Sequence, residues 1–189
     1  MANKIFMGLK NVHYAVVTET IGEDGKITTS YGTPKPWLGG VKLSASAQGQ
    51  NDNFYADDGV WANLVSNQGY DGSLEMAQIP EDVYTEVFGF IKTSGGGIAE
   101  YSNAKTKYVA LSFEFDGDEA ARKFTFYRVM LNRHDVESET KKESIDPKTF
   151  TCSFKASPRP DDGLVRYYED KDGTNYANWY QSVVVPSVG

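Results

Sequence analysis

Hydrophobic and polar residues alternate along much of the chain with a period of two. Residues 109–116 show this pattern most clearly, with Val109, Leu111, Phe113 and Phe115 at every second position. Similar alternation, or short β-like runs, predicts further strands at 12–20, 37–43, 53–56, 59–66, 70–76, 124–131 and 149–156. A period of two is typical of strands with one apolar and one polar face. The pattern therefore predicts a mainly antiparallel β protein.

Turn and helix signals fall between these runs. Asp58 and Gly59 separate two β-like stretches and fit a tight type I′ hairpin turn. One helix is predicted from Pro80, which suits the first helical position, to Gly89, which suits the end of a helix. A second, short helix is expected at 176–181. We therefore expect an antiparallel β-sandwich or barrel with one flanking α-helix.

Length and composition agree with a single domain covering residues 1–189. The chain has 40% hydrophobic and 24% charged residues, which is typical of a folded protein rather than a disordered one. No apolar run approaches the roughly 18 residues of a membrane helix. The apolar run near the N-terminus is too short for a signal peptide, so we expect synthesis in a cytoplasm and no membrane association.

The charge is unevenly distributed along the sequence. The net charge is −7, which argues against a protein that grips nucleic acid. Residues 52–100 contain nine acids and one base, Lys92, whereas the rest of the chain sums to +1. The nine acids are Asp52, Asp57, Asp58, Asp71, Glu75, Glu81, Asp82, Glu86 and Glu100.

Residues that could carry chemistry fit structural roles better. Cys152 lies on the apolar side of a predicted strand, and the pairs Asp57-Asp58 and Asp161-Asp162 each precede a glycine, as turn-forming acids do. The two histidines are too far apart in sequence to suggest a zinc site. We expect no enzyme activity, no cofactor and no metal. The aromatic residues Trp61, Trp179 and Tyr180 could stack on sugar rings or fill a core or interface.

The polar segment 44–52 is expected to be a loop. It is rich in small and polar residues, and its candidate contact residues are Ser44, Ser46, Gln48, Gln50 and Asp52. It could be an ordinary surface loop, or a segment that becomes ordered on contact with another subunit.

Several short motifs occur in an order that is together more specific than any one of them. They are GLKNVHY at 8–14, YGTPKP at 31–36, FYADDG at 54–59, GYDGSLEM at 69–76, IPED at 79–82, FEFDGD at 113–118, KESIDP at 142–147, DGLV at 162–165 and NWY at 178–180. In these motifs the chain resembles the major tail tube proteins of long, non-contractile-tailed phages (siphoviruses) of Gram-positive bacteria. The resemblance covers nearly the whole chain, and we expect it to lack the immunoglobulin-like decoration domain of some relatives.

This resemblance implies a structural virion protein in the tail, synthesised in the host cytoplasm. Such proteins form hexameric rings that stack into a hollow tube, and DNA passes through the lumen without specific binding. Tape-measure, tail terminator and baseplate or tail-tip proteins would be its partners. We expect Asp71, Ser73 and Glu75 to face the lumen, with an outer, solvated face as the alternative. The segment 44–52 would contact the neighbouring ring.

Other function classes stay open at this point. A carbohydrate-binding β-sandwich, such as a receptor-binding or lectin-like module, would use Trp61, Trp179 and Tyr180. A hydrolase would use one of the two Asp-Asp pairs. Another virion part, such as a head–tail connector, would share the same fold class.

Overall fold

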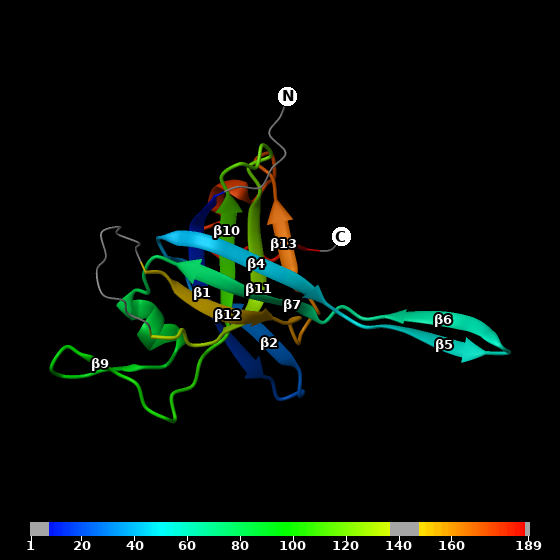
Figure 1. Cartoon of the computed structure of the whole chain (residues 1–189), viewed down its shortest axis with the longest axis horizontal. Coiled ribbons are helices and arrows are strands. Elements are labelled where there is room, and N and C mark those ends of the chain that lie inside the picture. Colours follow the sequence, from blue (N-terminus) through cyan, green and yellow to red (C-terminus); the bar gives the residue numbers. More distant parts are fainter. Residues whose placement is uncertain (1–7, 137–147, 188–189) are drawn as a thin grey trace.

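The computed structural model describes residues 8–136 and 148–187, so the motif at 142–147 lies outside the described part. A nine-stranded sheet in the order β2-β1-β10-β11-β12-β7-β4 dominates it, with β13 beside β11 and β3 beside β1 (Figure 1). Its strands are β1 (Leu9–Ile21), β2 (Ile27–Tyr31), β3 (Lys35–Pro36), β4 (Gly40–Gln48), β7 (Gly69–Met76), β10 (Val109–Phe115), β11 (Lys123–Leu131), β12 (Phe150–Ala156) and β13 (Arg166–Glu169). All the strand pairs are antiparallel. The expected mainly antiparallel β fold is confirmed.

The core lies where the apolar sides of these strands meet the helical segment. It contains Leu74 and Met76 of β7, Phe154 of β12, and residues of β1, β10 and β11.

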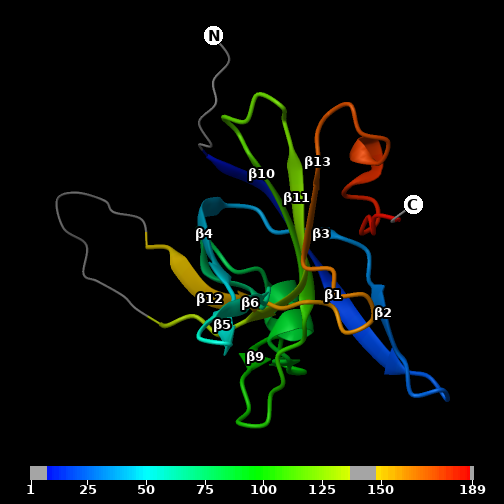
Figure 2. The ribbon, with the colours of Figure 1, turned by 90° about the vertical axis from the view of Figure 1, so that its right-hand side faces the viewer.

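In β10 the alternation does not separate an exposed side from a buried one, because Ser112 and Glu114 are buried as well. The Ser112 and Thr125 hydroxyls share a hydrogen bond of 2.7 Å, and Tyr180 donates one of 2.7 Å to Glu114. The C-terminal segment thus covers the second side of this strand (Figure 2).

The predicted helix is present but differs in its winding. Glu81 and Asp82 start the helix, and η1 (Val83–Val87) continues it as a π-helix. The hydrogen bond from Phe88 N to Val83 O spans five residues. This wider turn is compatible with the burial of Val83, Val87 and Phe88 together. Gly89 follows with a φ of +73°, as expected for a residue that ends a helix. The second predicted helix is η2 (Tyr176–Asn178), a single 3₁₀ turn.

Residues 40–76 form one long hairpin that leaves the sheet halfway. β4 and β7 pair within the sheet, and β5 (Asn51–Ala56) and β6 (Gly59–Val65) continue as a separate two-stranded ribbon. Backbone hydrogen bonds from Ser66 N to Gln50 O and from Gln68 N to Gln48 O, each 2.9 Å, join the two parts. We call residues 49–67 the arm, because this ribbon projects from the body of the molecule (Figure 1).

The hairpin turn at the tip of the arm lies one residue earlier in the sequence than predicted. Asp57 and Asp58 have φ angles of +50° and +57°, so they are the two central residues of the turn. Positive φ at both positions is the requirement of a type I′ hairpin, and aspartate tolerates it better than most residues. Gly59 instead begins β6.

The prediction of a loop at 44–52 is wrong. Ser44, Ser46 and Gln48 fall within β4, Asp52 belongs to β5, and only residues 49–50 separate the two strands. Cross-strand pairing with β7 and β6 overrides the weak strand preference of serine, alanine and glycine in this segment. A separate short hairpin joins β8 (Ile91–Lys92) to β9 (Ile98–Ala99).

Candidate functional site

One face of the β4–β7–β12 part of the sheet is polar and solvent-facing. Asp71, Ser73 and Glu75 of β7 project to this face, whereas Leu74 and Met76 between and after them are buried in the core. Strand alternation thus brings the three residues predicted to face the lumen onto one surface. Whether this surface faces a lumen stays a prediction.

Three rows of polar residues cross this face from β4 through β7 to β12. The register aligns them as Lys42–Glu75–Thr151, Ser44–Ser73–Ser153 and Ser46–Asp71–Lys155. Hydrogen bonds tie the face together: Ser44 and Ser73 share one of 2.9 Å, Asn132 donates one of 2.9 Å to Ser153, and Thr149 donates one of 2.6 Å to Glu75. We call these nine positions the hydroxyl face, since five of them are serine or threonine.

The hydroxyl face is balanced in charge. Asp71 is aligned with Lys155 on the neighbouring strand, and Glu75 is aligned with Lys42. The negative charges of the two acids are therefore balanced by the positive charges of the two lysines. The sequence could not reveal this balance, because Lys42 and Lys155 lie far from β7 along the chain and meet it only through strand pairing.

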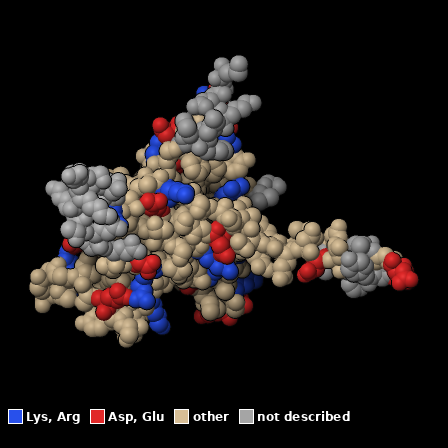
Figure 3. Space-filling view, in the orientation of Figure 1, with Lys and Arg blue, Asp and Glu red and all other residues tan. Residues whose placement is uncertain are grey.

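The acidic stretch of the sequence does not form one acidic surface. Only two of its nine acids lie on the hydroxyl face, and three more lie on the arm (Figure 3). Others form ion pairs elsewhere: Glu86 with Lys35 at 2.5 Å, Glu81 with Lys92 at 2.9 Å, and Glu100 with Arg133. Folding therefore distributes the acids of residues 52–100 over several surfaces, although they lie in one stretch of the sequence.

Strand β4 gives the sheet an edge. It stands at the end of the strand order and pairs with β7 on one side. Its nine residues include a single charge, Lys42, and Ala45 and Ala47 are both exposed. Monomeric proteins usually protect such edges with charges, prolines or bulges. A long edge with few of these features is suited to pairing with another chain.

The arm exposes apolar side chains. Trp61 and Val65 of β6 are 68% and 76% exposed, and Trp61 lies at a β-bulge in the pairing with β5. The arm carries Asp52, Asp57 and Asp58 and no lysine or arginine. An isolated two-stranded ribbon is at best marginally stable in water, so such a surface gains from a partner.

The residues predicted to form one inter-ring loop are divided between two surfaces. Ser44 and Ser46 belong to the hydroxyl face. Gln48 is the last residue of β4, the Gln50 backbone N–H donates to the Ser66 hydroxyl at 3.1 Å, and Asp52 lies on the arm. The structure thus leaves Gln50 and Asp52, rather than all five residues, on the projecting arm.

The aromatic residues considered for sugar binding are not brought together. Trp179 is buried and stacks on Tyr167, with ring centroids 5.6 Å apart. Tyr180 stacks on His13 and is bonded to Glu114, and burial raises its pKa. Trp61 is on the arm. The three residues therefore form no common sugar-stacking surface, because Trp179 is buried and Tyr180 packs against His13.

The paired acids have structural partners. Asp57 and Asp58 form the turn at the tip of the arm. Asp161 accepts two hydrogen bonds from the Arg159 guanidinium, 2.9 and 2.6 Å long, which hold the pKa of Asp161 well below its usual range. Asp162 accepts a bond from Leu164 N within its own turn. This supports the interpretation of both pairs as turn-forming acids.

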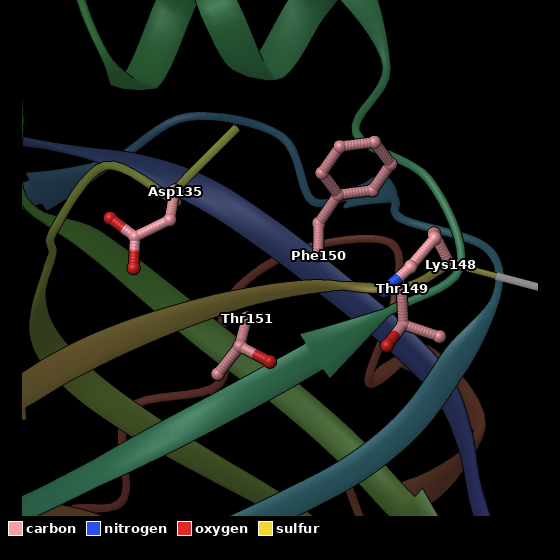
Figure 4. A pocket seen from close by; sticks show the side chains of 5 residues that line it. All are labelled: Asp135, Lys148, Thr149, Phe150 and Thr151. Atoms are coloured by element: carbon pink, nitrogen blue, oxygen red, sulfur yellow. The ribbon is translucent and has the colours of Figure 1, made fainter. Parts of the chain in front are cut away.

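The buried cysteine and a small hollow beside β12 are poorly suited to chemistry. Cys152 is buried in the core, and burial raises its pKa to about 11, which disfavours the reactive thiolate. A hollow beside β12 is lined by Asp135, Lys148, Thr149, Phe150 and Thr151 (Figure 4). Its volume of about 120 Å³ is below the roughly 300 Å³ at which small-molecule sites begin. Residues 8–136 and 148–187 hold no cluster of three or more metal-ligating side chains and no helix able to span a membrane.

A solved structure has the same overall fold as this chain. The chain is similar to the tube terminating cap of the anti-feeding prophage, with a TM-score of 0.50 and 8% sequence identity over 90% of this chain and 95% of that one. A chain of the anti-feeding prophage baseplate matches with a TM-score of 0.45 and 9% identity, over 91% of this chain and 99% of that one. No protein-family model and no curated protein matches the sequence. The likeness to the terminating cap shows that the two chains share a fold.

Proposed function

We propose that this chain is a structural subunit of a phage-type tail tube. Six copies form a ring, and the rings stack into a hollow tube through which DNA passes. The observation that carries the proposal is the hydroxyl face bounded by the open edge of β4. Pairing of that edge with a neighbouring copy would extend the sheet around a ring and remove an exposed edge.

The hydroxyl face is the surface that we assign to the lumen, with Asp71, Ser73 and Glu75 in its middle strand. Its five hydroxyls are wet and uncharged, and each of its acids is aligned with a lysine. A surface without net positive charge does not displace counterions from DNA, so it lets DNA slide rather than bind.

We assign the arm to contact with the neighbouring ring. Gln50 lies at the base of the arm, and Asp52 lies on β5. The exposed Trp61 and Val65 of the arm would be covered at this contact. The resemblance in sequence motifs adds a finer expectation, a siphovirus of Gram-positive hosts with tape-measure, terminator and baseplate proteins as partners. In this role the protein is a virion component and not an enzyme.

Electron microscopy of the purified protein over a concentration series, with light scattering alongside, tests the proposal. Six chains of 20.9 kDa give a ring of about 125 kDa, and we expect rings or hollow tubes at high concentration. A protein that stays monomeric at every concentration, with or without a tail initiator complex, would contradict the proposal.

A charge on the β4 edge provides a specific test. Ala45→Lys places a lysine on the exposed edge strand and should prevent ring formation while the monomer stays folded. Ala177→Lys, at an exposed position in η2, is the matched control and should assemble normally. Equal assembly of the two variants would argue against pairing through β4.

A further inference from the structure

The arm presents an apolar anchor that has no cover. Trp61 and Val65 are both exposed residues of β6, and the indole is 68% exposed. Buried tryptophans are among the strongest contributors to protein interfaces. The other two tryptophans, Trp37 and Trp179, are 0% and 1% exposed. Trp61 is therefore distinct among the tryptophans, all of which lie in the described part of the chain.

A hollow at the far end of the molecule has the shape and lining for such an anchor. It is lined by Tyr84, Phe90, Ile98 and Glu100 and has a volume of about 260 Å³. The rings of Tyr84 and Phe90 are stacked with centroids 5.5 Å apart, which gives the hollow one firm aromatic wall. A cavity of about 150 Å³ takes a benzene molecule, so this hollow has room for an indole ring.

More apolar surface surrounds this hollow. Ile91 of β8 is 56% exposed and Tyr101, next to Glu100, is 53% exposed. A second, polar hollow adjoins it and shares Glu100, which is paired with Arg133. An apolar centre with a polar rim is the usual composition of a protein interface.

The charges of the two ends are complementary. The arm carries three aspartates and no base. Residues 89–107 include three of the four residues that line the hollow, and they carry Lys92, Lys105 and Lys107 against the single acid Glu100, with Lys92 paired to Glu81. Lys105 and Lys107 are exposed, and within the described ranges no ion pair engages them. The acidic arm and the exposed Lys105 and Lys107 would therefore attract one another at a distance and favour one orientation.

The arm cannot fill the hollow of its own chain. The arm and the β8–β9 hairpin lie at opposite ends of the longest axis of the molecule (Figure 1). An anchor at one end and its receptor at the other define a head-to-tail contact, which generates rings or filaments rather than closed pairs. The occupant that fits these observations is a second copy of the chain.

We infer that the hollow lined by Tyr84, Phe90 and Ile98 receives the arm of a second copy, with Trp61 as the anchor. The three aspartates of that arm then lie near Lys105 and Lys107. This inference rests on the proposed function, since it names the receiving surface for the arm within the assembly.

Tryptophan fluorescence tests the seating of Trp61 directly. Iodide should quench Trp61 in the monomer and leave Trp37 and Trp179 unaffected, because these two are buried. On assembly we expect the quenchable signal to disappear and the emission to shift to shorter wavelength. Trp61→Phe removes the signal and identifies its source. An indole that stays quenchable in formed tubes overturns the inference.

Two substitutions weaken the contact from its two sides. Trp61→Ala and Ile98→Asp should each raise the concentration needed for assembly by tenfold or more. Ile21→Asp, at an exposed isoleucine of the β1–β2 hairpin, is the matched control and should have little effect. Circular dichroism of each monomer checks that it is folded. Assembly of folded Trp61→Ala at the concentration of the unmodified protein overturns the inference.

Cross-linking separates this inference from the proposed function. In a Cys152→Ser background, one preparation carries Asn63→Cys on the arm and a second carries Ala99→Cys beside the hollow. A disulfide-linked dimer of about 42 kDa should form only when the two are mixed. Tubes without this dimer overturn the inference and leave the tube proposal intact. The dimer without rings or tubes supports the contact and contradicts the tube proposal, and neither product overturns both.

Discussion

Gly72 allows a test of how the strands beneath the hydroxyl face pack. It lies in β7 between β4 and β12, aligned with Ala45 and Phe154. A Cβ at this position would lie 2.6 Å from Cζ of the Phe154 ring and closer still to the Ser44 carbonyl oxygen. Real Cβ atoms do not approach other heavy atoms this closely, so Gly72→Ala must displace the phenyl ring and β4.

The expected cost follows from these contacts. Overpacking in a well-packed region costs about 1–3 kcal/mol, and a backbone carbonyl yields less readily than a flexible side chain. We therefore expect Gly72→Ala to lower the free energy of unfolding by about 3 kcal/mol. For a domain of this size, that corresponds to a fall in Tm of roughly 6–12 °C. Ordinary Gly→Ala changes act in the other direction, by restricting the unfolded chain.

Urea unfolding followed by circular dichroism measures this difference. The matched control is Gly95→Ala in the β8–β9 hairpin, where a Cβ would meet no atom within 4 Å. The control should be neutral or slightly stabilising. If Gly72→Ala unfolds at the same urea concentration as Gly95→Ala, the close packing of β4, β7 and Phe154 is not as described.

Three further predictions concern titrating and exposed groups. Cys152 should react with a thiol reagent far more slowly in the native chain than in urea, because it is buried and its pKa is raised to about 11. Asp161→Asn should lower the free energy of unfolding near pH 7 by about 1–3 kcal/mol. The Arg159 guanidinium lowers the pKa of Asp161 in the folded state, so this stabilisation is present above the unfolded pKa of about 4 and is lost as the pH falls. The variant should therefore lose less stability than the parent in acid unfolding curves. In a density map of the tube, Asp71 and Glu75 should face the channel, and their appearance on the outer wall would contradict the lumen assignment.

The sequence predicted those features that depend on local patterning. The strand at 109–115 agrees with β10 residue for residue, and the alternation in 70–76 correctly separates Leu74 and Met76 from Asp71, Ser73 and Glu75. Period and side-chain direction are properties of a few neighbouring residues, so they can be read without knowing the partner strands. The helical segment after Pro80 was predictable for the same reason.

Features that depend on pairing between distant segments were not predictable. The segment 44–52 has the composition of a loop, and its role as an edge strand comes from β7 and β6. The neutral hydroxyl face arises because Lys42 and Lys155 become neighbours of β7. The uncovered state of Trp61 depends on a ribbon that leaves the sheet, and an aromatic residue in a strand usually signals a core position.

The arrangement of charge changes how passage of DNA through a tube of this chain would work. A wall with eight uncompensated acids per subunit would repel phosphate strongly and would also destabilise the ring by repulsion between subunits. The hydroxyl face avoids both effects, because each lysine that could hold a phosphate is aligned with an acid on the next strand. The acids of the arm are then free for a different task, attraction to the basic end of another subunit. In this arrangement one acidic stretch of sequence serves two surfaces: a neutral one suited to sliding and a charged one suited to assembly.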